Sequence, residues 1–257
     1  MNINVNGLNI NYEVSGDGKP VILLHGWLCS LETMKPIENI LNKNFKVYNV
    51  DLPGFGKSDM PTEAFNTNSF GDFLNGFIKE LKIENPILIG HSNGGRTIIN
   101  YAGRKLGKIN KIVLIDSAGI KPKRKMSYYA KVYTFKALKN IFKLFPNAEM
   151  FNNIRERVLG KFGSSDYKKS PEILRKTMSI IVNEDERDIL TNIECPTLLI
   201  WGENDEDTPL EDAKIMEKNI KDSGLVVLKN AGHFSYLDCY NDFSVIIKNF
   251  LMEEING

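Results

Sequence analysis

The sequence predicts an α/β fold in which helices cover both faces of a mostly parallel sheet. Short, nearly continuous apolar runs recur along the chain, which is typical of strands that are buried on both sides. Stretches with helical periodicity separate these runs, so strands and helices alternate. The 257 residues, 42% hydrophobic and 25% charged, are enough for a sizeable globular core.

The chain is expected to open with an antiparallel pair and to continue as a doubly wound sheet of eight strands. Residues 2–14 alternate polar and apolar side chains around Asn6-Gly7, a dipeptide suited to a type I′ hairpin turn. The six further strands are expected at 21–24, 45–50, 87–89, 112–115, 197–201 and 225–228, and the helices between them at 30–43, 66–82, 92–105, 209–221 and 238–254.

The interval 118–192 breaks this alternation. It contains no strand pattern, and its aromatic and aliphatic residues recur at helical spacing, so we predict a helical cap inserted after the sixth strand of a core formed by 1–117 and 193–257. Residues 117–190 contain 16 Lys and Arg against 8 Asp and Glu, although the whole chain has a net charge of +1. This basic segment is either a solvated helical surface or a guide for an anionic substrate.

Net charge, cysteine content and the distribution of apolar residues predict the kind of partner and the location of the protein. The near-neutral charge, without a basic helix, gives no indication of a nucleic-acid partner. Three cysteines without C-x-x-C spacing predict neither a disulfide framework nor a zinc site. The N-terminus does not resemble a signal peptide, and no stretch approaches about 18 apolar residues. We expect a soluble cytoplasmic protein that acts on a small molecule, without a membrane partner, in an oligomeric state that stays open.

The most informative motif is the G-x-S-x-G pentapeptide at 90–94. It follows a predicted strand and precedes a predicted helix, which is the context of a nucleophile elbow. Serine at such a turn adopts a strained backbone and needs glycines around it. The turn leaves the amide of Asn93 at a helix N-terminus, where it can stabilise an oxyanion. Ser92 is therefore the predicted nucleophile.

Three histidines are candidates for the base that activates Ser92. His91 neighbours Ser92 on a tight turn and is expected to point away from it. His25 begins a glycine-containing loop, for which holding the loop is favoured over catalysis. His233 follows the last predicted strand and is the predicted base by elimination.

An acid must orient the histidine and stabilise its charged form. Several carboxylates follow the strand at 197–201, and Asp205 is the predicted acid among them. Asp116 is a competitor because it also ends a strand at the carboxyl edge of the sheet. Glu203 and Asp207 are interpreted as structural acids of the same loop.

A second oxyanion donor is expected after the strand at 21–24. Gly26 permits close approach of the backbone, which places the amide of Trp27 beside that of Asn93. The Trp27 side chain either packs in the interior or forms a wall of the acyl pocket.

Taken together, the motifs resemble those of the α/β-hydrolase superfamily, specifically its serine-nucleophile members with a helical cap. The resemblance spans roughly residues 5–252, and the chain order Ser, Asp, His is the order that this fold uses. It implies a hydrolase with a catalytic triad, and the chemistry requires no metal and no organic cofactor. The motifs are HGW at 25–27, DLPGFGKSD at 51–59, GHSNGG at 90–95, WGEND at 201–205 and GHF at 232–234.

Some subfamilies fit less well. Epoxide hydrolases and haloalkane dehalogenases use an aspartate nucleophile, whereas this chain has Ser92. Proline iminopeptidases show a His-Gly-Gly-Pro-Gly loop, whereas Trp27 and Leu28 follow Gly26 here. Meta-cleavage-product hydrolases, which break carbon–carbon bonds, commonly carry Trp after the catalytic histidine. This chain has Phe234 there, so that activity remains an alternative.

Arg96 lies four residues beyond Ser92. It resembles the arginine of the Gly-Gly-Arg that follows the nucleophile in a menaquinone-pathway synthase of this superfamily, where it would face an anionic substrate. A structural ion pair is the other interpretation. The candidate substrate-binding residues are His25, Arg96 and Phe234.

Three functions are compatible with these motifs. The leading hypothesis is a carboxylesterase that acts through an acyl-enzyme. A carbon–carbon hydrolase or lyase-type enzyme is the second, with Arg96 or the cap residues Arg155 or Arg157 holding an anionic substrate. The third is a ligand receptor that retains a slow hydrolase site.

Overall fold

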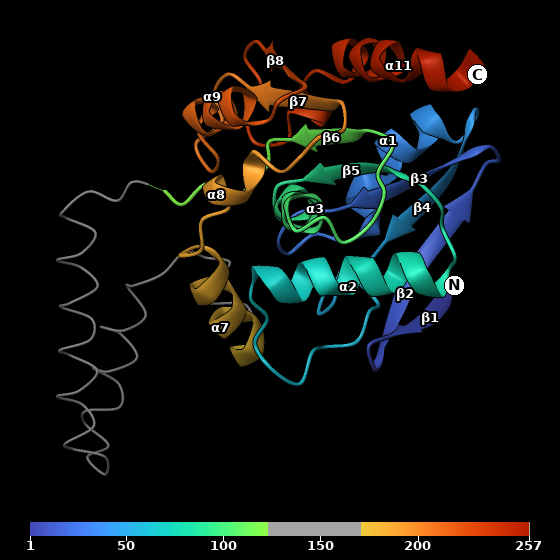
Figure 1. Cartoon of the computed structure of the whole chain (residues 1–257), viewed down its shortest axis with the longest axis vertical. Coiled ribbons are helices and arrows are strands. Elements are labelled where there is room, and N and C mark those ends of the chain that lie inside the picture. Colours follow the sequence, from blue (N-terminus) through green and yellow to red (C-terminus); the bar gives the residue numbers. More distant parts are fainter. Residues whose placement is uncertain (123–170, 257) are drawn as a thin grey trace, which may run out of the picture.

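The apolar runs assemble into an eight-stranded sheet in the computed structural model, which describes residues 1–122 and 171–256. The strand order is β1-β2-β4-β3-β5-β6-β7-β8 (Figure 1). β2 pairs antiparallel with β1 and with β4, and the other neighbouring strands are parallel. This confirms the predicted fold class. The strands are β1 (Asn2–Val5), β2 (Leu8–Ser15), β3 (Lys19–Leu24), β4 (Phe45–Val50), β5 (Ile87–His91), β6 (Ile112–Ile115), β7 (Thr197–Gly202) and β8 (Ser223–Leu228).

The first hairpin has the predicted turn. Asn6 and Gly7 have φ of 53° and 85°, so both central residues lie in the left-handed region that a type I′ turn requires. The turn sets a register in which Val5 lies opposite Leu8. Both residues turn toward the same hydrophobic cluster as a result.

Two layers of helices bury the two faces of the sheet. In β3, Ile22 and Leu24 belong to one core cluster, and Val21 and Leu23 belong to the other, as the two-residue period of a strand requires. The first cluster includes side chains of α2, α3 and α9, and the second includes side chains of α1 and α11 (Figure 1). These helices are α1 (Leu31–Leu41), α2 (Thr67–Glu80), α3 (Asn93–Gly103), α9 (Leu210–Asn219) and α11 (Tyr240–Asn256).

Residues 171–192, the described C-terminal part of the predicted cap, form two helices joined by turns. These helices are α7 (Glu172–Ile181) and α8 (Arg187–Leu190), with no strand between 171 and 192. The segment is attached to the start of α2, because the amide of Thr67 donates to Glu184 Oε2 at 2.7 Å. The aromatic stripe that predicts the first cap helices lies outside the described residues. The domain boundaries at 118 and 192 therefore remain a prediction.

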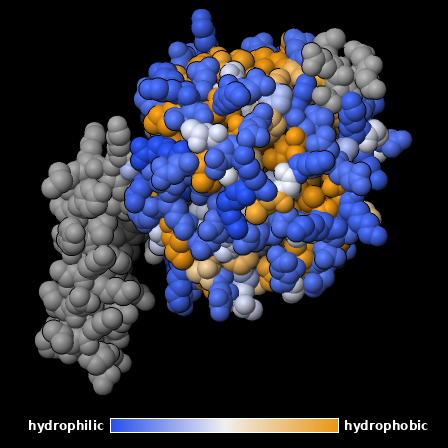
Figure 2. All heavy atoms as spheres, viewed as in Figure 1, coloured by the Kyte–Doolittle hydropathy of each residue, from blue (hydrophilic) through white to orange (hydrophobic). Residues whose placement is uncertain are grey.

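One face of the described core is mainly hydrophilic, as expected when the helices bury their apolar sides against the sheet. On this face, Figure 2 shows mostly hydrophilic side chains, with smaller hydrophobic areas between them. None of the described helices has the length and apolar character needed to span a membrane.

Candidate active site

The nucleophile elbow joins β5 directly to α3. Ser92 has φ of 51° and ψ of −111°, a strained conformation for a residue with a side chain, which costs about 1–3 kcal/mol. The turn is anchored to the end of β6. The Ser92 amide donates to the Ile115 carbonyl and the Ala118 amide donates to the Ser92 carbonyl, both at 3.0 Å. The neighbouring strand therefore holds the strained conformation in place.

Three glycines let the chains around Ser92 approach one another. A Cβ on Gly94 would lie 2.1 Å from the carbonyl oxygen of Leu24, and a Cβ on Gly90 would lie 2.5 Å from the carbonyl carbon of Gly94. A Cβ on Gly26 would lie 3.3 Å from Ser92 Cβ. The elbow and the loop after β3 are therefore in direct backbone contact, as expected for a shared oxyanion site.

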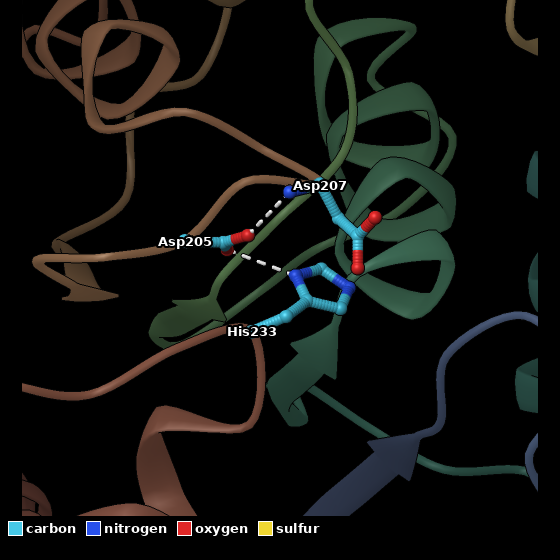
Figure 3. A group of neighbouring side chains, drawn as sticks. All are labelled: Asp205, Asp207 and His233. Atoms are coloured by element: carbon cyan, nitrogen blue, oxygen red, sulfur yellow. Dashed lines mark hydrogen bonds and ion pairs between the residues drawn. The ribbon is translucent and has the colours of Figure 1, made fainter.

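The structure brings Ser92, His233 and Asp205 together from the ends of three strands. His233 Nε2 lies 3.0 Å from Ser92 Oγ. On the other side of the ring, His233 Nδ1 lies 2.8 Å from Asp205 Oδ2 (Figure 3). Asp205 lies between β7 and α9, and His233 lies between β8 and α10 (Ser235–Asp238). An ionised Asp205 can only accept, so Nδ1 carries the proton and Nε2 is the acceptor that faces the serine hydroxyl.

The electrostatics suit this arrangement. Burial acts to raise the pKa of Asp205, but hydrogen bonds from His233 and Thr208 outweigh it, so the pKa lies below its ordinary value. Burial acts to lower the pKa of His233, but the hydrogen bond and charge of Asp205, and then the charges of Asp207 and Asp116, raise it. Asp205 is therefore ionised at neutral pH and stabilises a protonated His233.

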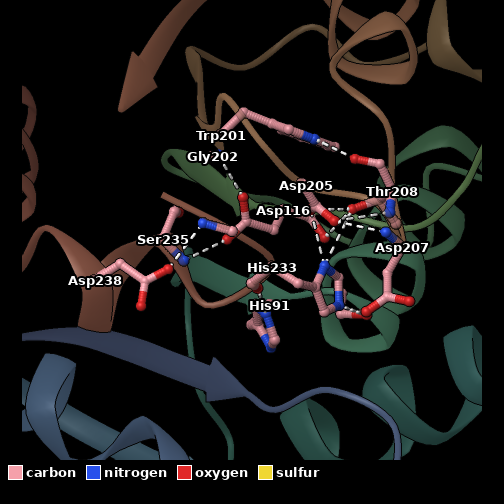
Figure 4. Close-up of polar contacts among 12 residues, drawn as sticks. His91, Asp116, Trp201, Gly202, Asp205, Asp207, Thr208, His233, Ser235 and Asp238 are labelled. Carbon is pink, nitrogen blue, oxygen red and sulfur yellow. Dashed lines mark hydrogen bonds and ion pairs between the residues drawn. The ribbon is translucent and has the colours of Figure 1, made fainter. Parts of the chain in front are cut away.

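Asp116, the competing acid, is occupied elsewhere. It is completely buried, and its two oxygens accept from the amides of Gly202 at 2.8 Å and Ser235 at 2.9 Å (Figure 4). Burial raises its pKa to about 7 despite these bonds. A carboxyl of that pKa is only partly ionised at neutral pH, which makes Asp116 a poorer counter-ion than Asp205. Its contacts join the loop that carries Asp205 to the loop that carries His233.

Two contributions to the site were missed by sequence reasoning. His91 Nε2 lies 2.7 Å from the His233 carbonyl oxygen and donates to it, so His91 supports the base through its backbone. Thr208 Oγ1 donates to the Asp205 carboxylate at 2.7 Å. The threonine three residues after the acid was a local signal, but the contact of His91 joins residues 142 positions apart and had no local signal.

His25 has a structural position, which favours its interpretation as a loop-holding residue over a role in binding substrate. Its Nδ1 donates to the Gly26 carbonyl at 2.8 Å, and its Nε2 accepts from the Leu52 amide at 3.0 Å. Burial lowers its pKa to about 4, so the ring stays neutral. No ring nitrogen is left for a substrate, and His25 ties the loop after β3 to the loop after β4.

The two predicted oxyanion donors have free amides. Within residues 1–122 and 171–256, neither the Trp27 amide nor the Asn93 amide donates a hydrogen bond. Asn93 is the first residue of α3, so its N–H has no partner within the helix. The Trp27 ring packs at 4.9 Å from the Phe55 ring in an edge-on contact, which favours the packing role of its side chain.

Arg96 and Phe234 differ in accessibility. Arg96 is 4% exposed, and its Nη1 donates at 2.6 Å to the carbonyl oxygen of Ile181, the last residue of α7. Arg96 therefore supports α7 through a backbone acceptor, which favours the structural interpretation of Arg96 over a substrate contact. Phe234 is 36% exposed and its ring centroid lies 5.7 Å from that of His233, so it remains a candidate substrate contact.

Within the described residues, Asp205, Asp207 and His233 form a group close enough to hold a metal, with ligand atoms within 4.8 Å of one another. Asp205 and His233 already bond each other, and a metal would have to break that bond.

A surface cavity of about 580 Å³ between α2 and the loop after α3 is lined by Lys79, Tyr101 and other residues. None of its lining residues belongs to the triad, so it does not mark the site.

Comparison with known proteins gives consistent similarities. A family model described as alpha/beta hydrolase fold matches residues 19–149, and one described as TAP-like protein matches 180–253. AB hydrolase superfamily protein YisY of Bacillus subtilis is 29% identical, covering 91% of this chain and 92% of that protein. Pimeloyl-[acyl-carrier protein] methyl ester esterase of Nitrosospira multiformis is 27% identical, with coverages of 95% and 98%. The solved structure of esterase EaEST from Exiguobacterium antarcticum has a TM-score of 0.75 at 26% identity, covering 98% of this chain and 99% of that one.

Proposed function

Because the chain belongs to the α/β-hydrolase family, we propose that it is a serine carboxylesterase that cleaves a small carboxylic ester. The observation that carries the proposal is the continuous hydrogen-bonded series from Ser92 through His233 to Asp205, next to two free amides. Esters need a nucleophile, a base and oxyanion donors, and these residues supply all of them. The esterases among the similar proteins support the same class.

The proposed reaction has two steps. Ser92 Oγ attacks the ester carbonyl while His233 Nε2 takes its proton, and the amides of Trp27 and Asn93 stabilise the oxyanion. The C–O bond then breaks and His233 returns the proton to the leaving alcohol, which leaves an acyl-enzyme. His233 then deprotonates a water molecule, which attacks the acyl-enzyme. The bond from the acyl carbon to Ser92 Oγ breaks and His233 returns the proton to Ser92 Oγ, which releases the acid. Asp205 keeps His233 in the required tautomer in both steps.

Replacing Ser92 tests the proposal. Ser92→Ala should reduce kcat for p-nitrophenyl butyrate by about 10⁶-fold, because the nucleophile is lost. The measurement is steady-state hydrolysis followed by release of p-nitrophenol. Ser179→Ala, an exposed serine of α7, is the matched control and should keep wild-type activity. Wild-type turnover by Ser92→Ala would exclude Ser92 as the nucleophile.

The alternative activity on a carbon–carbon bond has less support. It needs a cation for an anionic substrate, and Arg96 is buried and bonded to α7. The other predicted cations, Arg155 and Arg157, lie outside the described residues. Preference for carboxylated dienones over neutral esters would favour this alternative. Tight ligand binding with negligible turnover would instead favour the ligand receptor.

A further inference from the structure

Asp207 places a second carboxylate beside the proposed base. It follows Asp205 by two residues in the loop after β7, and its amide donates to Asp205 Oδ1 at 2.9 Å. Figure 3 shows its carboxylate next to the imidazole of His233, on the side away from Asp205. One of its oxygens lies within 4.8 Å of a His233 ring nitrogen and of an Asp205 carboxylate oxygen. The residue interpreted from sequence as a structural acid therefore faces the site.

The carboxylate of Asp207 has no partner in the described part of the chain. It is exposed, and it accepts no hydrogen bond and forms no ion pair with any residue of 1–122 or 171–256. Among the described residues, the other titratable groups that act on His233 are Asp205 on the same loop, Asp116 after β6, and His91, whose pKa burial lowers to about 3. His91 is therefore neutral, and the described groups make the field on this side of the site negative.

We propose that Asp207 is a specificity-determining residue that favours esters with a neutral or positively charged alcohol portion over esters with an anionic one. The proposal rests on the proposed function, because His233 Nε2 must give its proton to the leaving alcohol. The alcohol therefore passes the edge of the ring beside which Asp207 lies. The Asp207 carboxylate lies within 4.8 Å of His233, so a charge on the passing alcohol comes close to it. An interaction between two such exposed charges changes binding by several-fold and is screened by salt.

Two esters that differ in one charge test the selectivity. Butyrylcholine carries a quaternary nitrogen where 3,3-dimethylbutyl butyrate carries a carbon. The ratio of kcat/KM for butyrylcholine to that for 3,3-dimethylbutyl butyrate therefore isolates the effect of the positive charge. Asp207→Asn should lower this ratio about 3- to 5-fold at low salt, because a unit charge at this distance is lost. Glu206→Gln removes the same charge from the neighbouring exposed residue and should leave the ratio unchanged. An equal ratio in wild type and Asp207→Asn would overturn the proposal.

A measurement without turnover separates this inference from the proposed function. Burial lowers the pKa values of His25 and His91 to about 4 and about 3, whereas the Asp205 hydrogen bond and nearby carboxylates raise the pKa of His233, so its titration is separated from theirs in an NMR titration. A negative charge stabilises the imidazolium, so Asp207→Asn should lower the pKa of His233 by about 0.5 and move the acid limb of kcat/KM to lower pH.

The two proposals fail in different ways. An unchanged pKa of His233 in an active Asp207→Asn enzyme would overturn the role of Asp207 alone. Wild-type protein that hydrolyses no ester would overturn the proposed function, and the selectivity would fall with it. A lowered pKa together with a lowered ratio is the expected result.

Discussion

The nucleophile elbow and the loops that carry the acid and the base are built in different ways. The elbow depends on backbone contacts so close that a Cβ at Gly94 would lie 2.1 Å from the Leu24 carbonyl oxygen. The other two loops depend on hydrogen bonds between segments far apart in sequence, such as Asp116 to Ser235 and His91 to His233. Sterics therefore fix the nucleophile, and a polar network fixes its partners.

This difference predicts how each region responds to substitution. A steric contact between backbone atoms cannot relax without moving a strand, so one added methyl group should displace the elbow. In a polar network several hydrogen bonds hold the loops together. The loss of one member should therefore affect kcat by an amount that depends on which groups that member contacts. The acid that bonds the imidazole should matter more than the acid that joins the loops.

Among the partners of Ser92, the largest expected effect is on Asp205. Asp205→Asn keeps the shape of the side chain but cannot stabilise the imidazolium or hold Nδ1 protonated, so kcat for p-nitrophenyl butyrate should fall by about 10⁴-fold. Thermal unfolding should show that the variant is folded. Glu206→Gln, an exposed acid of the same loop, should keep wild-type activity. Near-normal turnover by Asp205→Asn would transfer the role of the acid to another carboxylate.

A smaller but still large effect is expected at the elbow. Gly94→Ala introduces a Cβ into the Leu24 backbone, which should lower the free energy of unfolding by about 3 kcal/mol. The displaced oxyanion amides should lower kcat about 10²-fold. Urea unfolding and ester hydrolysis check the two values.

Gly224→Ala is the matched control for the elbow. A Cβ on Gly224, in β8, has no atom within 4 Å, so this variant should unfold at the wild-type urea midpoint. If Gly94→Ala were as stable and as active as Gly224→Ala, close packing would not be what holds the elbow.

The sequence predicted most of the fold and the nucleophile because their signals are local. The runs at 45–50 and 112–115 match β4 and β6 residue for residue, since strands that are buried on both faces are rich in apolar residues. Gly90 and Gly94, two of the glycines that pack around Ser92, each lie two residues from it. Strand order was not fixed by these signals, but the Asn6-Gly7 turn did fix the first hairpin.

The remaining site features depend on contacts that sequence separation conceals. Nothing near Asp116 indicates that it accepts from Ser235, 119 residues away, and nothing near His25 indicates that Leu52 occupies its second nitrogen. Asp207 was interpreted as a structural acid because its direction relative to His233 depends on how two loops fold together. Arg96 was matched to a motif, but the position of α7 decides what it bonds.

The smallest effect on kcat is expected for Asp116, and it distinguishes the role of Asp116 from that of Asp205. Asp116→Asn leaves one oxygen to accept from Gly202 or Ser235, while its NH₂ group faces the other amide, so one buried bond is lost. That loss should cost about 1–3 kcal/mol of the free energy of unfolding, and the loosened loops should lower kcat only about tenfold. Asp238→Asn is the control, because Asp238 accepts from the same loop at the surface and an asparagine oxygen can replace it. If Asp116→Asn lost as much kcat as Asp205→Asn, the hydrogen bonds that join the loops would matter as much for catalysis as the contact of Asp205 with the His233 imidazole.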